Sequence, residues 1–223
     1  MKKQTKHYWM LCALCFLSAF LFTLCDARRQ NEALASRISP DILRFHVLAN
    51  SNSPRDQSLK LAVKTLVVCF VSDHLGNLSN KEETTHWLME HKDEIESLAR
   101  AYLLSQNAPS EVRLTLSRDY FPTKSYGDLV FPCGVYDAAR LTIGKGSGRN
   151  WWCVLYPPLC YTDAIHAVVP ESSKELLQEL LASDDYEALI REASEKPRVT
   201  IRLRLPELLN SLFSGSDEPL PAP

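Results

Sequence analysis

Residues 41–71 read DILRFHVLANSNSPRDQSLKLAVKTLVVCFV, and they predict a strand followed directly by a helix. Residues 42–49 are rich in strand-forming side chains. Ser53 is a candidate N-cap, Pro54 takes the first helical position and Asp56 completes a capping box. Apolar residues then recur at helical spacing, at Leu59, Ala62, Val63, Leu66, Val67 and Phe70.

Helical and strand patterns continue through the chain in clusters rather than in strict alternation. One amphipathic helix is expected over residues 81–106, and a charged helical region over 170–194. Apolar and polar residues alternate at 112–117, 139–143 and 198–205, which predicts three strands, the last with a basic face. Residues 150–156 are also predicted to form a strand. These patterns predict a single α+β domain: a mixed or antiparallel sheet of four to five strands with two main helices packed on one face.

The N-terminus carries an export or anchoring segment. Lys2, Lys3 and Lys6 precede an uncharged run from Tyr8 to Cys25. This pattern is typical of a signal peptide cut after residue 27, and also of a retained membrane anchor, with residues 8–25 in the membrane. The rest divides into a linker (28–40), a core domain (41–163), a helical and strand extension (164–213) and a disordered tail (214–223).

Composition excludes several functional classes. The 223 residues carry a net charge of −2, which argues against a protein that binds nucleic acid by neutralising phosphates. No His-Glu-x-x-His motif occurs, and no Cys-x-x-Cys pair follows residue 27, so no metal site or other cofactor is expected.

Four cysteines follow the N-terminal segment: Cys69, Cys133, Cys153 and Cys160. Cys153 and Cys160 are the preferred disulfide pair, because the two prolines between them can turn the chain back. Four buried thiols are the alternative. A secreted hydrolase with Cys153 or Cys160 as nucleophile and His46 or His166 as base is a further hypothesis.

Residues 150–161, NWWCVLYPPLCY, concentrate aromatic side chains. Trp151 and Trp152 face opposite sides of a strand, so one fills the core and the other needs cover from a helix, the tail or a partner. An exposed aromatic anchor is a common centre of an interface. Residues 121–127, FPTKSYG, form a second aromatic and basic stretch.

Three blocks of this sequence resemble the stage II sporulation protein R family. The first is Leu43–Ser51 with Ser53, Pro54, Asp56 and Gln57, and the second is Phe121–Lys124 with Tyr126 and Gly127. The third is Ile143, Gly144, Gly148 and Asn150–Cys160. The blocks occur in the family's order and together span about residues 41–163.

The resemblance implies an intercellular signal rather than an enzyme. Members of the family are exported from the forespore into the space between the forespore and mother-cell membranes. There they activate a membrane-embedded aspartic protease that processes a mother-cell pro-sigma factor. The family supplies no catalytic residues to transfer. Candidate receptor-binding residues are Lys124, Tyr126, Asn150, Trp151, Trp152, Tyr156 and Tyr161.

Overall fold

A four-stranded mixed sheet is the centre of the computed structural model, which describes residues 2–75, 79–108, 111–160 and 169–195. Its strands are β1 (Leu43–Leu48), β2 (Val112–Phe121), β5 (Gly134–Ile143) and β6 (Asn150–Tyr156), in the order β2-β5-β1-β6. β1 runs parallel to β5, and the other two pairs are antiparallel. The predicted strand at 198–205 lies outside the described residues.

A two-stranded sheet joins β3 (Lys124–Tyr126) to β4 (Leu129–Phe131). The first strand of this hairpin lies in the aromatic and basic stretch at residues 121–127, and the second strand follows that stretch. Gly127 has a positive φ of 56° between the two strands, a conformation that glycine adopts at little cost. The α+β class and the four-stranded mixed sheet agree with the sequence-based prediction, and the two-stranded sheet adds to it.

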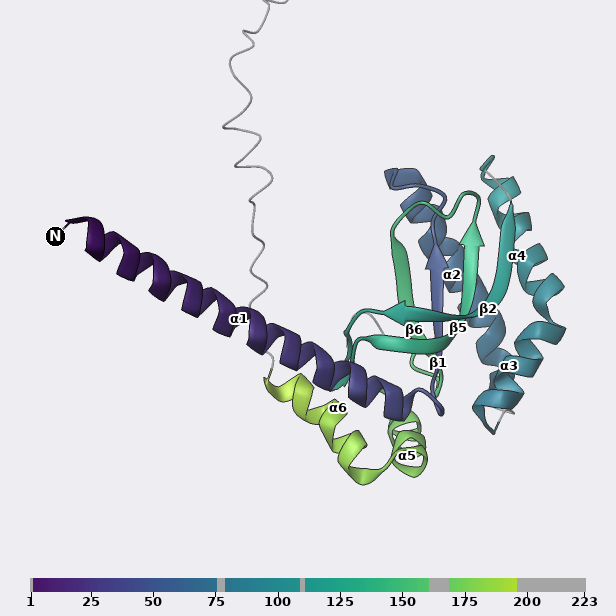
Figure 1. Cartoon of the computed structure of the whole chain (residues 1–223). Coiled ribbons are helices and arrows are strands. Elements are labelled where there is room, and N and C mark those ends of the chain that lie inside the picture. Colours follow the sequence, from purple (N-terminus) through teal and green to yellow (C-terminus); the bar gives the residue numbers. More distant parts are fainter. Residues whose placement is uncertain (1, 76–78, 109–110, 161–168, 196–223) are drawn as a thin grey trace, which may run out of the picture.

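Helices cover both faces of the sheet (Figure 1). The expected pair on one face is present as α2 (Pro54–Leu75) and the α3–α4 pair (Lys81–Glu90 and Lys92–Ser105), which form the first core with Phe45, Val47 and Leu141. On the opposite face, α5 (Glu171–Leu180), α6 (Ser183–Glu195) and the end of α1 (Lys2–Ile38) form a second core. β1 is buried on both sides, so it needs cover from both layers.

The single helix expected over 81–106 is broken at His91. This residue has φ −98° and ψ 15°, and its backbone N–H still donates to the carbonyl of Trp87. It is both the C-cap of α3 and the N-cap of α4, although its side chain makes no capping bond to α4. The apolar spacing continues across the break, which explains why the pattern alone predicts one helix.

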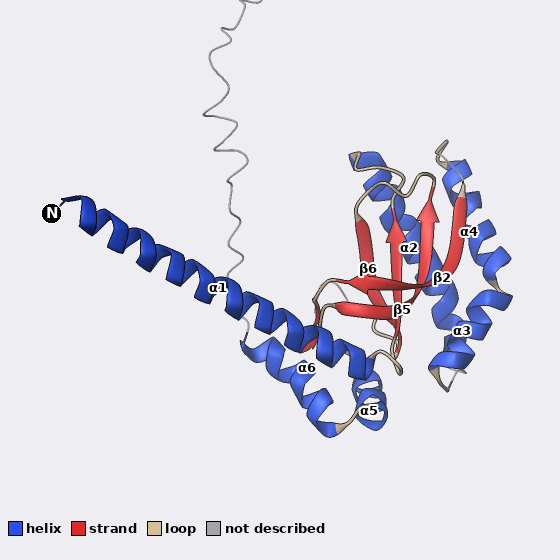
Figure 2. Cartoon of the chain, viewed as in Figure 1, coloured by secondary structure: helices blue, strands red, loops and turns tan. Residues whose placement is uncertain are grey.

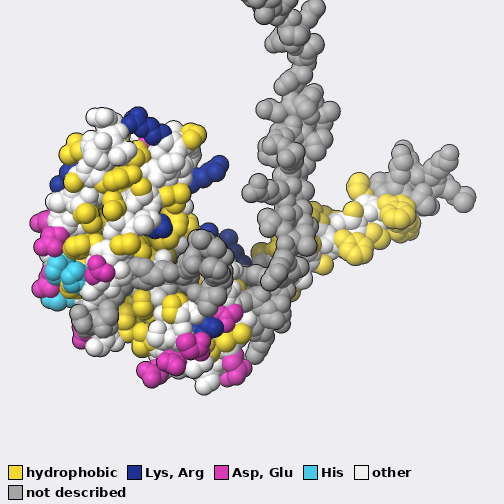
Figure 3. All heavy atoms as spheres, turned by 180° about the vertical axis from the view of Figure 1, so that it is seen from behind, with side chains coloured by type: hydrophobic (Ala, Val, Ile, Leu, Met, Phe, Trp, Pro, Cys, Tyr) yellow, Lys and Arg dark blue, Asp and Glu magenta, His cyan; other side chains and the backbone are white. Residues whose placement is uncertain are grey.

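Residues 28–38 continue α1 instead of forming the linker expected from their polar composition. Leu34, Ala35 and Ile38 are buried in the second core. Tyr120 Oη donates to Glu32 Oε1 over 3.1 Å, and Arg37 pairs with Asp185 at 2.8 Å. The apolar part of α1, by contrast, stands away from the body of the molecule (Figure 3).

Candidate functional site

The two tryptophans of β6 lie on opposite faces of the sheet, as alternation predicts. Trp151 pairs with Val47 and packs edge-on against Phe45, with ring centroids 6.3 Å apart. Lys64 Nζ lies 5.0 Å from the Trp151 ring centroid, within cation–π range. Trp152 stacks on His46, with ring centroids 4.8 Å apart and planes 1° apart. Both tryptophans are half-buried, so neither projects as a free anchor.

His46 connects Trp152 to an acidic residue that is distant in the sequence. Its Nε2 lies 2.9 Å from Asp119 Oδ2, and its side chain is 4% exposed. Burial lowers the pKa of His46, and this outweighs the opposing effect of Asp119. Burial by itself raises the pKa of Asp119, but bonds from Ser117 and His46 bring it below its ordinary value. Both shifts favour a neutral imidazole beside an ionised carboxylate, an arrangement in which the His46 Nε2–H donates to Asp119.

Arg44 is fully buried beside this pair, in a cage of aromatic rings. Its guanidinium carbon lies within 6 Å of four ring centroids, the nearest at 4.6 Å from Phe121. Its Nη2 donates to Tyr126 Oη at 3.5 Å, and that hydroxyl donates to the carbonyl of Trp152 at 3.3 Å. Burial lowers the pKa of Arg44 and raises that of Tyr126. Tyr126 is thus tied to Trp152 by a polar bridge.

The other predicted contact residues are dispersed. Lys124 and Asn150 are half-buried, in β3 and at the start of β6. Tyr156 is 3% exposed in the first core, and its hydroxyl donates to the carbonyl of Ser79 over 2.7 Å. Tyr161 lies outside the described residues. The structure therefore brings together Tyr126 and Trp152, and it gives Tyr156 a place in the core.

Cys153 and Cys160 are joined by a disulfide with Cα atoms 5.3 Å apart. Phe45 pairs with Cys153 and His46 with Trp152, so Cys153 and His46 lie on opposite faces of the sheet. The structure thus separates these two hydrolase candidates and occupies both sulfur atoms in a covalent bond. His166 lies outside the described residues.

A pocket of about 650 Å³, which no pattern in the sequence indicates, lies between α3 and the sheet. Its apolar lining includes Met89 and Leu116, which are 41% and 37% exposed. The alternation in residues 112–117 predicts that Leu116 faces the core. The position of α3 in the structure leaves Leu116 partly uncovered. Because α3 comes from a distant part of the chain, periodicity in β2 carries no signal for this pocket.

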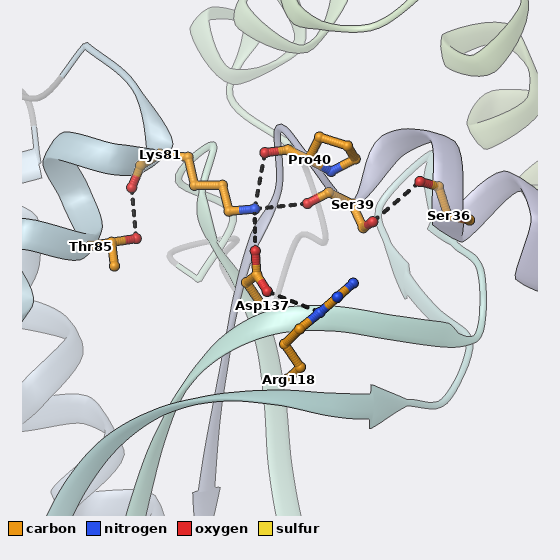
Figure 4. A network of polar contacts seen from close by, with 7 residues as sticks. All are labelled: Ser36, Ser39, Pro40, Lys81, Thr85, Arg118 and Asp137. Carbon is orange, nitrogen blue, oxygen red and sulfur yellow. Dashed lines mark hydrogen bonds and ion pairs between the residues drawn. The ribbon is translucent and has the colours of Figure 1, made fainter.

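A charged network closes one side of this pocket (Figure 4). Lys81 Nζ donates to the carbonyls of Ser39 and Pro40, both at 2.9 Å, and to Asp137 Oδ2 at 2.7 Å. Arg118 lies 3.3 Å from the other oxygen of Asp137. All three ammonium hydrogens of Lys81 therefore have acceptors, and they tie α3 to the end of α1 and to β5.

α1 is the one described helix long and apolar enough to cross a membrane, over Tyr8–Ile38. None of its most apolar stretch is buried by the domain. An apolar N-terminal helix of this kind suggests a signal or anchor, which is consistent with a domain outside the cytoplasm.

Comparison with known proteins confirms the resemblance seen in the sequence. Residues 39–166 match the family model described as Stage II sporulation protein R. The chain is 32% identical over 199 residues to Stage II sporulation protein R of Bacillus subtilis (strain 168), covering 85% of this chain and 89% of the relative. No solved structure gives a significant match. The chain belongs to the stage II sporulation protein R family.

Proposed function

We propose that this protein is an exported signal that activates a membrane-embedded aspartic protease, which then processes a mother-cell pro-sigma factor. Family membership carries the proposal, because it supports a role in sporulation and the resemblance implies this activity. The apolar α1 helix supports export, since it precedes a folded domain whose disulfide suits an oxidising compartment.

Activation needs differential binding rather than mere contact. A ligand that binds two states of a protease equally does not shift the equilibrium between them, so the signal must bind the active state more tightly. The rigid elements of the domain support this role, because β6 and the β3–β4 hairpin hold Trp152 and Tyr126 in a fixed relation. Receptor contact through Lys124, Tyr126, Asn150, Trp151, Trp152 and Tyr161 remains part of the proposal.

The hydrolase alternative gains no support from the described residues. A thiolate nucleophile needs a free sulfur, and Cys153 and Cys160 are bonded to each other. His46 instead faces Asp119 and Trp152 on the other side of the sheet.

Co-purification tests the proposed contact. A protease variant without its catalytic aspartate is expressed with the full chain in a non-sporulating bacterium, and the solubilised protease is captured through a tag. We expect the chain to be retained on the captured protease. A chain without residues 1–27 stays in the cytoplasm and is the control, so equal retention of both forms contradicts contact outside the cell.

A further inference from the structure

One end of the sheet presents a polar face without a helix over it. We call this surface the polar sheet end, and it consists of Arg113, Thr115, Arg140, Thr142 and Asn150. The alternation of side chains and the strand register place all five on the same face of the sheet as Trp152. None of the five belongs to either core. In Figure 1, α1, α5 and α6 gather at the opposite end of the strands, away from the turns that follow β1 and β5. Figure 2 shows these strands in front of α2 and α4.

Unpartnered polar atoms collect on this face. Within the part of the chain that the structure describes, the buried side-chain atoms without a hydrogen-bond partner belong to Arg44, His46, Thr115 and Asn150. The strand register puts all four residues on the same side of the sheet. Thr115 and Asn150 belong to the polar sheet end, whereas His46 lies farther along the strand, against the rings of Phe121 and Trp152. Buried polar atoms normally have partners, so Thr115 Oγ1 and Asn150 Oδ1 point to a ligand at this end of the sheet.

The polar sheet end is also positively charged. Arg113 and Arg140 line a hollow of about 300 Å³ together with Thr115, Thr142, Gly144 and one acidic residue, Glu111. In the strand register, Thr115 pairs with Arg140, and Arg113 pairs with Thr142. The two arginines are therefore diagonal neighbours on adjacent strands. Arg113 contacts Glu111 and Arg140 contacts Asp119, both at 3.5 Å.

Donors are left over for a ligand at this hollow. A guanidinium carries five N–H donors, more than these contacts use. Asp119 is already shared with His46 and Ser117, so it neutralises Arg140 only in part. The adjoining turn adds Lys145 and Arg149, both exposed. The strands at this end and the adjoining turn together carry four cationic side chains against two acidic ones, on a chain whose net charge is −2.

We propose that the polar sheet end binds an acidic, extended segment of a partner protein. A carboxylate of that segment lies between Arg113 and Arg140, where paired N–H donors favour it. The Thr115 hydroxyl donates to the same carboxylate, and Asn150 Oδ1 accepts a backbone N–H of the segment. The inference deepens the proposed function, because it gives the chemistry of the receptor segment that the signal contacts.

A peptide titration tests this inference without the protease. The probe is a labelled, end-capped peptide of alternating glycine and glutamate, and the reference peptide has glutamine in place of glutamate. The full chain is titrated in detergent micelles, and fluorescence anisotropy reports binding. We expect the glutamate peptide to bind more tightly than the glutamine peptide, and we expect its binding to weaken with added salt. Equal binding of the two peptides, or none, overturns the inference.

A matched pair of arginines on β2 localises the contact. The Arg113 and Arg118 side chains are 69% and 71% exposed, and each lies near one carboxylate, but they point to opposite faces of the sheet. Arg113→Glu is expected to weaken binding of the glutamate peptide about tenfold, the scale of a lost charge-assisted contact. Arg118→Glu is expected to leave it unchanged. An equal loss in both variants, with unchanged unfolding midpoints, overturns the assignment.

The same pair separates this inference from the proposed function. In cells with the protease and its substrate, Arg113→Glu should reduce substrate processing and Arg118→Glu should not. If the unaltered chain triggers no processing, the proposed function fails, and the peptide titration still decides the inference. If Arg113→Glu loses the peptide but processes fully, the receptor is not the acidic partner and the inference is overturned.

Discussion

At the scale of single residues, His46 makes the stability of the domain depend on pH. Its pKa in the folded state lies below the ordinary value of 6.5, chiefly because it is buried. The unfolded chain therefore binds more protons below pH 6.5, and the stabilisation from the neutral imidazole is lost as the pH falls through the folded pKa. Asp119 acts in the same direction, but only near and below its ordinary value of 3.8.

We expect His46→Gln to flatten the pH dependence of stability between pH 7 and 5. Glutamine keeps an N–H donor for Asp119 and removes the titrating ring. Urea unfolding at several pH values measures the effect. His86→Gln is the control, because that side chain is 76% exposed. A slope unchanged by His46→Gln contradicts the assignment.

Trp152 is a candidate receptor contact, and its side chain also packs within the domain. Its ring stacks on His46 and lies 4.7 Å from the Phe121 centroid. We expect Trp152→Ala to lower the free energy of unfolding by about 3 kcal/mol, because the cavity cannot close around those rings. Leu104→Ala removes an exposed apolar side chain and should change stability little. Similar urea midpoints for the two variants would show that Trp152 contributes little to the core.

At the scale of elements, α1 approaches β5 closely at Gly134. A Cβ added to Gly134 would collide with the Cβ of Ala35, so α1 or β5 would have to shift. We expect Gly134→Ala to cost about 1–3 kcal/mol and to increase proteolysis within residues 28–38. Val135→Ala, at an exposed neighbouring position, is the control for the strand itself. Unchanged proteolysis would mean that α1 is held by other contacts.

The disulfide closes a short loop after β6. Replacing Cys153 and Cys160 by serine should lower the free energy of unfolding by about 2–3 kcal/mol, as expected for a loop of this length. Urea unfolding of the exported protein with and without reductant measures this difference. If reductant leaves the unfolding midpoint unchanged, the bridge is not formed in the exported protein.

At the scale of the whole molecule, the sequence predicted those elements in which apolar residues recur at a regular spacing. Val112, Leu114 and Leu116 alternate with polar residues, so β2 could be predicted, and the helix after Ser53 carries its own capping signals. The opposed faces of Trp151 and Trp152 follow from the same period. Residues 28–38 were missed because Leu34, Ala35 and Ile38 are a small apolar minority whose burial depends on β5.

The candidate site depends on contacts that no local pattern encodes. Asp119 reaches His46 across 73 residues of chain, and Arg44 is buried although it looks like a solvent-facing strand residue. The same is true of the polar sheet end, where Arg113 and Arg140 meet only because β2 pairs with β5. Sequence identifies the family and these residue types, and the sheet determines which of them meet.

In the proposed function, this chain acts outside the cytoplasm and activates a protease. A non-sporulating bacterium carrying the receptor protease and its pro-sigma substrate provides the direct measurement, with the substrate's length read by immunoblot. The full chain should cause shortening of the substrate, and a stable chain without residues 1–27 should not. Shortening by both forms, or by neither when the exported chain and the protease are present and folded, would contradict the account.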